Sequence, residues 1–513
     1  YWDTEIKLAQ VSGFDDYPLF TRKVATDVSY LACSRLMLSR PDAFYPQFAT
    51  HNAHTVAAIS VMAGNSGDYE FQRLHGMGQA LYDEVVAKDG LGQPCRIYAP
   101  VGSHEDLLAY LVRRLLENGA NTSFVNRLAD DDAPIDEIIA DPVQRIDGLE
   151  VVRHAHIAMP RDIFAPRANS RGVPLWHGPV RAELYAGIDK CLAEGVAASA
   201  IVDGKPGKGE PARSMRSPHD TGVEVGTVSD ASAGQAARAL KSSAAVQDDW
   251  DKLGGAARAV ILEKAADLYE KNTVRLMALL VREAGKTLDN ALADLREAVD
   301  FLRYYAALAR GEFSESQVLP GPTGERNEIS LHGRGVFTCI SPWNFPLAIF
   351  TGQMAAALAA GNAVIAKPAE QTPLVAFEAV RLLHEAGVPG SVLHLLPGDG
   401  ARLGKLLLAD PALAGVAFTG SNDTATVIHH ALAARRGPIV PLIAETGGMN
   451  AMIVDSSALP EQAVQDVVWS AFDSAGQRCS AARIMFVQAD VAGRLLPMLK
   501  GAIEELRIGD PLD

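Results

Sequence analysis

Two series of short apolar segments alternate with longer helical patterns along this chain, and this alternation limits its possible folds more than any other feature. Strands separated by helices pair in parallel, so each series predicts a parallel sheet or barrel. The first series occupies residues 1–128. Its expected strands and helices are Tyr45–Thr50, Glu70–Leu74, Arg96–Pro100, Val24–Ser39, Met77–Ala87 and Glu105–Asn118.

An acidic, irregular stretch separates the two series. Residues 129–150 include Asp130-Asp131-Asp132 and are predicted to be a solvated linker. Asp203–Thr221 is rich in Gly, Pro and charge and is predicted to be a surface loop. From residue 222 the patterns resume, with a helix expected after Thr372 as N-cap. The other expected elements are Ala256–Tyr269, Leu276–Gly285, Asn362–Ala366, Val392–Leu396, Val416–Thr419 and Ile443–Ala444.

Charge and cysteine content argue against several classes of protein. With 47 Lys+Arg against 62 Asp+Glu, the net charge of −15 argues against a general nucleic-acid surface. The five cysteines are far apart and form no CxxC pair, which argues against a disulfide framework and a zinc site, so we expect no metal. Gln353, Gly361 and Asn362 interrupt the apolar stretch Pro346–Ala366, which therefore predicts a buried helix and strand instead of a membrane span.

Three residues of the second series suggest covalent chemistry on a thiol. Cys479 lies among small residues in Ser474–Ser480, which suits close approach of a substrate, although a lone cysteine is more often a small buried hydrophobe. Glu445 follows an apolar strand and precedes two glycines, so its carboxylate is expected over a cleft; a turn or helix cap is the alternative. Asn344 lies in a loop fixed by two prolines, with an ordinary turn residue as the alternative.

Glycine-rich turns at other strand ends suit a dinucleotide. Pro397–Gly404 has the pattern G-x-G-x-x-x-G, one residue longer than the usual fingerprint, in which glycines let the backbone approach a pyrophosphate. Phe418–Ser421 is a second turn of this kind. Lys367 and Glu370 follow a further strand, where they are spaced to hold ribose hydroxyls or, alternatively, to form a surface pair. Each signal is weak by itself.

Together and in this order, these motifs resemble those of the aldehyde dehydrogenase superfamily over about residues 210–513. Glu445 and Cys479 are 34 residues apart, the separation that the family shows. The resemblance implies that Cys479 is the nucleophile, that Asn344 and the Cys479 N–H stabilise the oxyanion, and that Glu445 activates the hydrolytic water. It also implies a site for NAD, favoured over NADP, formed by Trp343, Lys367, Glu370, Gly400, Gly404, Gly420 and Ser421.

The first series carries a different set of candidate residues. Arg113 and Arg114 are adjacent on its last helix, where two guanidinium groups can clamp a carboxylate. The alternative is an ordinary exposed turn in which Arg113 pairs with Glu117. The candidates at strand ends, where barrel active sites gather, are Thr50, His51 and Tyr98.

This region resembles the proline dehydrogenase barrel, and its place before an aldehyde dehydrogenase resembles the bifunctional proline utilization A family. The matching segments are Tyr1–Asp3, Thr21–Lys23, Phe48–Asn52, Arg96–Val101 and Tyr110–Arg127. The resemblance implies that proline is bound by Tyr1, Tyr98, Arg113, Arg114 and Glu117. It implies that FAD is contacted by Trp2, Arg22, Lys23, Thr50 and His51. The implied reactions are FAD-dependent oxidation of proline to pyrroline-5-carboxylate and NAD-dependent oxidation of glutamate semialdehyde to glutamate.

The expected fold is α/β: the C-terminal half of a (β/α)8 flavin barrel, followed by an aldehyde dehydrogenase fold with a Rossmann-like NAD-binding domain. The expected domains are 1–128, a linker and connecting segment over 129–209, and 210–513. The first domain holds three complete strands and the tip of a fourth, and the family's later Glu-x-Phe-Gly-Pro segment is absent. We therefore expect a fragment cut at both ends.

The resemblance further implies a homo-oligomer in the cytoplasm, with a quinone acceptor, peripheral association with the inner membrane and no nucleic-acid partner for this segment. Two other functions stay open at this point. One is an aldehyde dehydrogenase of other specificity with a non-functional barrel remnant. The other is a DNA-binding repressor, which the negative charge opposes.

Overall fold

The computed structural model describes residues 2–65, 67–119, 134, 136 and 139–512, without the side chains at 105, 106, 109 and 117–119. The chain forms two compact units. Unit 1 comprises Tyr1–Leu8 and Asp16–Ala158, and unit 2 comprises Ala9–Asp15 and Met159–Asp513. Helix α1 (Trp2–Ser12) contributes residues to both units.

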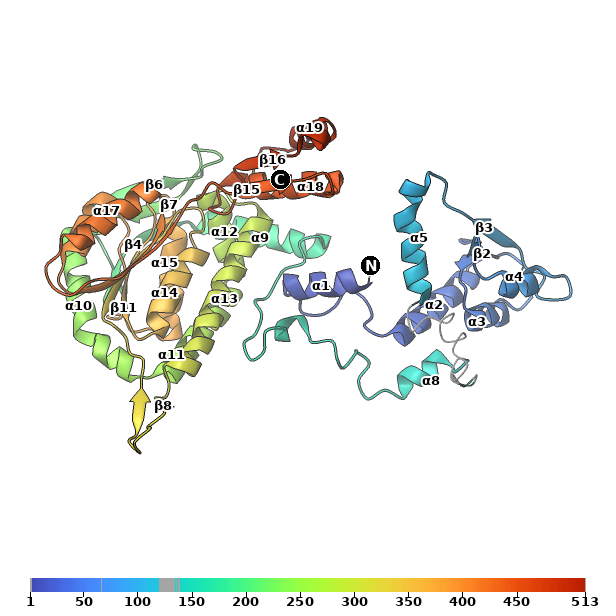
Figure 1. Cartoon of the computed structure of the whole chain (residues 1–513), viewed down its shortest axis with the longest axis horizontal. Helices are drawn as coiled ribbons and strands as arrows, with labels where there is room; N and C mark the ends of the chain where they lie inside the picture. The colour runs from blue at the N-terminus through green and yellow to red at the C-terminus, as the bar shows by residue number, and fades with distance from the viewer. Residues whose placement is uncertain (1, 66, 120–133, 135, 137–138, 513) are drawn as a thin grey trace. The chain divides into compact units, whose positions relative to one another are not determined.

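Unit 1 is built on a three-stranded parallel sheet in the order β1-β2-β3, with a helix after each strand (Figure 1). The strands are β1 (Gln47–Ala49), β2 (Glu70–Leu74) and β3 (Cys95–Tyr98). The helices are α2 (Lys23–Leu38), α3 (Ala53–Ala63), α4 (Gln79–Val86), α5 (His104–Gly119) and α8 (Pro142–Asp147). This repeated strand–helix unit is the one that the sequence pattern predicts.

The core of unit 1 is aromatic. Phe48, Tyr69, Phe71 and Tyr82 are almost completely buried, and neighbouring rings meet at centroid distances between 5.5 and 6.3 Å. Edge-on and tilted contacts of this kind add to the stabilisation from apolar burial. Phe48 of β1, Phe71 of β2 and Tyr82 of α4 contribute to this core, whereas three of the four residues of β3 are exposed.

Unit 2 is built on a nine-stranded sheet in the order β14-β13-β10-β11-β12-β4-β7-β6, with β5 paired to β4. Strands β14, β13, β10, β11 and β12 are mutually parallel. The strands are β4 (Val196–Val202), β5 (Lys205–Gly207), β6 (Ala212–Arg216), β7 (Glu224–Ser229), β10 (Val336–Ile340), β11 (Ala363–Lys367), β12 (Leu393–Leu395), β13 (Leu413–Gly420) and β14 (Leu442–Thr446). The chain order reverses beside β10, and open α/β sheets bind ligands at the carboxyl ends of the strands at such a reversal.

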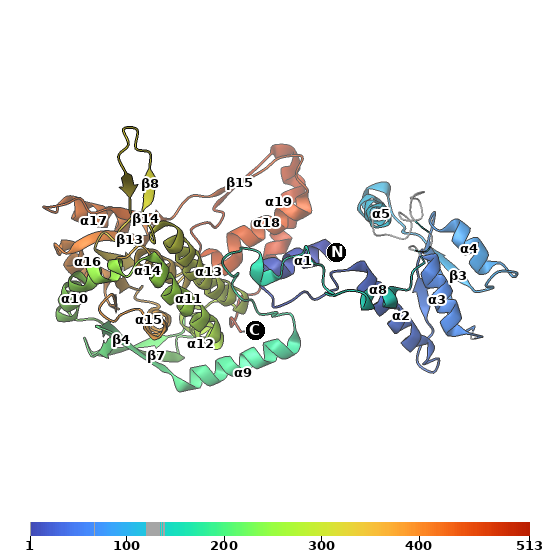
Figure 2. The same cartoon turned by 90° about the horizontal axis from the view of Figure 1, so that it is seen from below.

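Helices cover both faces of this sheet (Figure 2). Helices α14 and α15 pack on one face with α11, α12 and α13 behind them, and α10, α16 and α17 pack on the other, as the right-handed crossovers require. The helices are α9 (Gly178–Glu194), α10 (Ala233–Lys252), α11 (Gly255–Lys271), α12 (Thr273–Ala284), α13 (Leu288–Glu312), α14 (Ala348–Ala359), α15 (Pro373–Ala386), α16 (Gly400–Ala409) and α17 (Asn422–Ala433). All five residues of β11 are buried as a result.

Two smaller sheets complete unit 2. Parallel strands β15 (Ala451–Val454) and β16 (Ile484–Val487) pack with α18 (Pro460–Phe472) and α19 (Ala489–Glu504) around a separate apolar cluster. Strands β8 (Gln317–Leu319) and β9 (Asn327–Ile329) form an antiparallel hairpin that projects from the unit in Figures 1 and 2. The short helices η1 (Pro160–Asp162) and η2 (Asp473–Gly476) connect longer elements.

The structure corrects three local expectations. Asp203–Thr221, predicted to be a loop, contains strands β5 and β6. β5 pairs with β4 and β6 pairs with β7, through backbone hydrogen bonds that a Gly- and Pro-rich composition does not reveal. Helix α8 lies within the stretch 129–150, which the sequence predicts to be irregular. Thr372 is at the N-cap of α15, but among the described residues its hydroxyl has no hydrogen-bond partner.

The apolar stretch Pro346–Ala366 is, as predicted, a buried helix followed by a buried strand, α14 and β11. Of the helices in the described part of the chain, none is long and apolar enough to cross a membrane.

Candidate active sites

All the motifs that the sequence singles out in the second series, except that of Cys479, lie at the carboxyl ends of the five parallel strands of unit 2. Asn344 follows β10, Lys367 ends β11, Gly400 follows β12, Gly420 ends β13 and Glu445 lies near the end of β14. Ile340 pairs with both Lys367 and Phe418, and Thr419 pairs with Glu445, so neighbouring strand ends stand at the same level. The fold therefore gathers these segments at one edge of the sheet.

A hydrogen bond joins the Asn344 loop to the turn that carries Cys479. Asn344 Nδ2 donates to the carbonyl oxygen of Gln477 at 2.7 Å. Asn450 Nδ2 donates to the carbonyl oxygens of Cys479 at 2.6 Å and of Ala481 at 3.0 Å, which holds the turn from the other side. Because an amide nitrogen carries two hydrogens, Asn344 can bind this turn and still donate to an oxyanion. Cys479 itself is exposed.

The backbone just before Cys479 is bent into an uncommon conformation. Residues Ser474–Gly476 have φ angles of 56°, 55° and 67°, and two of the three carry side chains that disfavour this left-handed region. Arg478 holds the bend, because it pairs with Asp473 at 3.1 Å and its guanidinium lies 5.0 Å from the centroid of the Trp469 ring. These contacts hold the backbone on the N-terminal side of Cys479.

Lys367 and Glu370 form one end of the candidate NAD site. Lys367 Nζ donates to Glu370 Oε1 at 2.9 Å, and the Gly400 N–H at the start of α16 donates to the same oxygen at 2.6 Å. A Cβ on Gly400 would lie 3.1 Å from that oxygen, so glycine allows this close approach. Burial raises the pKa of Glu370, but Lys367 and backbone donors lower it and prevail. A cation, a carboxylate and a helix N-terminus in contact fit the hydroxyl and phosphate groups of NAD.

Gln353 connects the ends of two strands at this edge. From α14, its Nε2 donates to Thr419 Oγ1 at 3.0 Å and to the Ile340 carbonyl at 3.3 Å. Its Oε1 accepts a hydrogen bond from Ser341 Oγ at 2.8 Å. The side chain thus ties the turn at the end of β13 to the end of β10.

The remaining predicted NAD residues lie around the same edge. Ser421 is the N-cap of α17 and accepts a hydrogen bond from the Thr424 N–H at 3.2 Å. Trp343, next to Asn344, is 42% exposed. Gly404 lies further along α16 and is buried.

In unit 1, Thr50 and His51 follow β1, and Tyr98 ends β3. Tyr82 Oη donates to the Thr50 carbonyl at 2.6 Å, and His51 Nε2 accepts a hydrogen bond from the Leu74 N–H at 3.4 Å. Leu74 pairs with Tyr98 in the sheet, so these residues share the carboxyl edge of the sheet. Burial lowers the pKa of His51, which favours the neutral ring. A neutral donor–acceptor edge of this kind fits the ring system of a flavin.

The other predicted FAD residues lie on α1 and at the start of α2. Their hydrogen-bond partners are the Phe20 carbonyl for Trp2 Nε1 (2.9 Å), the Arg153 carbonyl for Arg22 Nε (3.1 Å) and the Asp27 carboxylate for Lys23. The structure thus holds these side chains through residues other than the strand ends.

The two adjacent arginines lie on α5. The guanidinium carbon of Arg114 is 5.1 Å from the centroid of the Tyr110 ring, one turn earlier on the helix. Tyr1 and the side chain of Glu117, both predicted to contact proline, lie outside the described residues.

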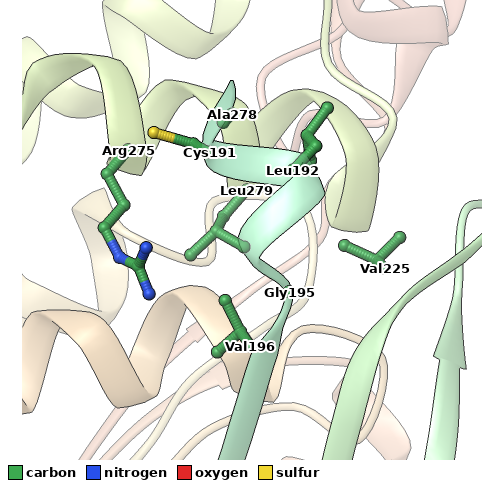
Figure 3. A pocket seen from close by; sticks show the side chains of 8 residues that line it. All are labelled: Cys191, Leu192, Gly195, Val196, Val225, Arg275, Ala278 and Leu279. Carbon is green, nitrogen blue, oxygen red and sulfur yellow. The ribbon is translucent and has the colours of Figure 1, made fainter. Parts of the chain in front are cut away.

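A small pocket of unit 2 is separate from these residues. α9, α12, β4 and β7 line it, and Figure 3 shows Cys191 and Arg275 at its side. Arg275 is already paired with Glu378 at 2.8 Å. No predicted site residue lines this pocket, so it plays no part in the candidate sites.

The sequence does not reveal Asn450 or Gln353 as part of the site. Their partners are 29 and 66 residues away, so no local pattern marks them. A polar amide within the mostly apolar helix α14 is the one signal that Gln353 offers.

Comparison with known proteins agrees with this geometry. The sequence model described as "Aldehyde dehydrogenase family" matches residues 206–513, and the one described as "Proline dehydrogenase" matches residues 1–127. The bifunctional protein PutA of Klebsiella aerogenes is 52% identical over 529 aligned positions, which cover 100% of this chain and 39% of that protein. The corresponding protein of Escherichia coli K12 is 51% identical with the same coverage. The chain therefore spans 39% of the length of these curated relatives.

Solved structures of known proteins have the same fold as this chain. The structure of proline utilization A from Bdellovibrio bacteriovorus, inactivated by N-propargylglycine, has a TM-score of 0.90 at 31% identity and covers 100% of this chain and 53% of that chain. The 1-pyrroline-5-carboxylate dehydrogenase from Thermus with bound NAD has a TM-score of 0.65 at 31% identity, covering 68% of this chain and 69% of that one. The predicted α/β architecture, a proline dehydrogenase segment before an aldehyde dehydrogenase fold, is confirmed. The chain thus belongs to the aldehyde dehydrogenase family, joined to a proline dehydrogenase segment as in the PutA proteins.

Proposed function

We propose that the protein carrying this chain oxidises proline to glutamate in two steps. Unit 1 contributes to FAD-dependent oxidation of proline to pyrroline-5-carboxylate, and unit 2 contributes to NAD-dependent oxidation of glutamate semialdehyde. The observation that carries this proposal is the hydrogen bond from Asn344 Nδ2 to the Gln477 carbonyl at 2.7 Å, at the strand edge that also holds Glu445, Lys367 and Gly400. The names of the relatives, PutA and 1-pyrroline-5-carboxylate dehydrogenase, support this substrate over another aldehyde.

The chemistry in unit 2 follows from its side chains. The thiolate of Cys479 attacks the aldehyde carbon and forms a carbon–sulfur bond. The second N–H of the Asn344 amide and the Cys479 backbone N–H stabilise the negative oxygen that results. NAD, when bound, accepts the hydride that leaves this carbon. Glu445 then takes a proton from water, whose oxygen attacks the thioester carbon. The carbon–sulfur bond breaks, which releases the carboxylate product and returns Cys479 to its thiolate.

Lys367, Glu370 and Gly400 would hold the adenosine ribose and phosphates of NAD, with Trp343, Gly404, Gly420 and Ser421 lining the cofactor. The carboxylate of Glu370 favours NAD over NADP, because a 2′-phosphate would face a negative charge.

In unit 1, Arg113 and Arg114 would bind the proline carboxylate, together with Tyr1, Tyr98 and Glu117. Trp2, Arg22, Lys23, Thr50 and His51 would contact FAD, which accepts the hydride of proline when bound. The protein would pass these electrons to a quinone as a cytoplasmic homo-oligomer that associates peripherally with the inner membrane.

The test is Cys479→Ala in the full-length protein. NADH formation from glutamate semialdehyde is expected to fall below detection, because no other group supplies the thioester, while proline still bleaches the flavin at the wild-type rate. Cys339→Ser is the matched control, since Cys339 is completely buried and burial raises its pKa to about 12. Normal NADH production by Cys479→Ala would refute the proposal for unit 2, and absence of proline-dependent bleaching in the wild type would refute it for unit 1.

A further inference from the structure

The turn between α12 and α13 contacts two parts of the candidate site that are far apart in sequence. It runs from Glu283 through Gly285, whose φ of +68° suits glycine, to Lys286, and Asp294 lies two turns into α13. Glu283 and Lys286 are 4% and 5% exposed, and Asp294 is completely buried. Charged groups are rarely buried this deeply without partners, so their contacts are informative.

Lys286 and Asp294 hold the loop that carries Asn344. Lys286 Nζ lies 4.5 Å from the centroid of the Phe345 ring and 3.5 Å from Asp294 Oδ2. Asp294 Oδ1 accepts a hydrogen bond from the Ala348 N–H at 2.7 Å, where α14 begins. The loop is thus held on both sides of Pro346: next to the Asn344 amide through the ring of Phe345, and at the start of the following helix.

Glu283 holds the helix that follows the Lys367–Glu370 loop. Its two carboxylate oxygens accept hydrogen bonds from the N–H groups of Leu374 at 2.7 Å and Val375 at 2.9 Å. Glu283 therefore caps α15 from a distant part of the chain, in place of the Thr372 hydroxyl that the sequence predicts as the cap. A carboxylate at a helix N-terminus satisfies donors that would otherwise be unpaired.

We propose that this turn is a positioning element shared by the oxyanion and NAD sites, with Lys286 and Asp294 setting the place of Asn344 and Glu283 setting that of Lys367 and Glu370. The inference deepens the proposed function and rests on it. Each of the two loops moves only as far as the buried contacts to this one segment allow. Catalysis depends steeply on such placement, because a shift of about 1 Å can cost roughly 10²-fold in rate.

The experiment tests the roles of Lys286 and Glu283 independently, by single substitutions in the full-length protein. Lys286→Met is expected to lower kcat for glutamate semialdehyde by roughly 10- to 100-fold while the Kd for NAD stays within twofold of the wild-type value. Glu283→Gln replaces one of the two acceptor oxygens with an amide nitrogen. It is expected to raise the Kd for NAD by about tenfold, the loss of one buried hydrogen bond, with a much smaller change in kcat. The matched controls are Lys264→Met and Glu385→Gln, both at exposed positions of the neighbouring helices.

A second variant tests whether Lys286 acts only through folding. Lys286→Met leaves the carboxylate of Asp294 buried without its cation, whereas Lys286→Met with Asp294→Asn removes both charges and keeps an acceptor for the Ala348 N–H. The double variant is expected to recover the thermal midpoint but not kcat. Recovery of kcat together with the midpoint would overturn the proposal, as would equal losses in kcat and NAD affinity for both single variants.

Hydrogen exchange gives a readout that does not require turnover. Peptides covering residues 344–350 are expected to exchange faster in Lys286→Met than in the wild type, and peptides covering residues 367–375 faster in Glu283→Gln. Unchanged exchange at both places would overturn the positioning role. A wild-type protein without semialdehyde oxidation, but with these changes in exchange, would instead contradict the proposed function and leave the structural coupling established.

Discussion

The two units place their candidate residues at the same kind of position, the carboxyl ends of parallel strands, yet they differ in how the surrounding structure supports them. In unit 2 the sheet is covered on both faces, and β11 is buried along its whole length. In unit 1 three of the four residues of β3 are exposed, and Leu108, Leu115 and Leu116 of α5 are each more than 60% exposed.

This difference extends to the hydrogen bonds that hold the site. In unit 2 the Asn344–Gln477 and Gln353–Thr419 bonds connect residues 133 and 66 positions apart. In unit 1 the bonds at the strand ends, from Tyr82 to Thr50 and from Leu74 to His51, connect residues 32 and 23 positions apart. A local sequence pattern can thus place a residue at a strand end, while rigid placement of its side chain depends on packing from distant segments.

The largest effect is expected from Asn344→Ala in unit 2. Removing one oxyanion donor is expected to lower kcat for glutamate semialdehyde by roughly 10²- to 10³-fold, because the amide is already held in place before substrate binds. Steady-state NADH formation measures this, with Asn327→Ala in the β8–β9 hairpin as the control. An effect below about fivefold would mean that the Gln477 bond, and not an oxyanion, is the role of this amide.

A smaller effect is expected from Arg113→Met and Arg114→Met in unit 1. Each is expected to raise the KM for proline roughly ten- to hundredfold, the loss of one charged hydrogen bond, and to leave semialdehyde oxidation unchanged. Stopped-flow bleaching of the flavin by proline measures it, with Arg145→Met on α8 as the control. If both variants keep wild-type affinity for proline, the pair belongs to an ordinary surface turn.

The smallest effect is expected on the folding stability of unit 2 at low pH. His394 of β12 is completely buried, its Nδ1 accepts from the Asp203 N–H at 3.1 Å, and burial lowers its pKa to about 4 from an ordinary value of 6.5. The unfolded chain therefore binds a proton that the folded chain does not between these pH values. The folded state is expected to lose about 2 kcal/mol as the pH falls from 7 to 5.

Urea unfolding measures this loss at pH 7 and pH 5, followed by tryptophan fluorescence, to which Trp250, buried in unit 2, contributes. His394→Gln keeps a donor and an acceptor but cannot titrate, so the difference between wild type and variant isolates the histidine from the other groups. Equal pH dependence in the two proteins would show that His394 is not responsible.

Much of the candidate site could be predicted because its candidate residues lie in short, recognisable sequence segments. Cys479, Glu445, Asn344 and Lys367 each follow a recognisable strand or loop pattern, and the structure places the last three at the ends of β14, β10 and β11 in one parallel sheet. The positions of β5 and β6 could not be predicted, because pairing at the edge of a sheet depends on a partner strand and only weakly on residue type.

Periodicity and local motifs in the sequence predict the alternation of strands and helices in both series, the family, and the candidate residues of the site. Only the tertiary structure decided that β10 lies between β11 and β13 and that Glu283 caps α15 in place of Thr372. It alone brought Asn450 to the backbone of Cys479 and Lys286 to Phe345. The physical reason is that strand order and buried polar contacts join residues tens to more than a hundred positions apart, and the side chain that satisfies a buried donor is selected by proximity in the folded chain, which no local pattern encodes.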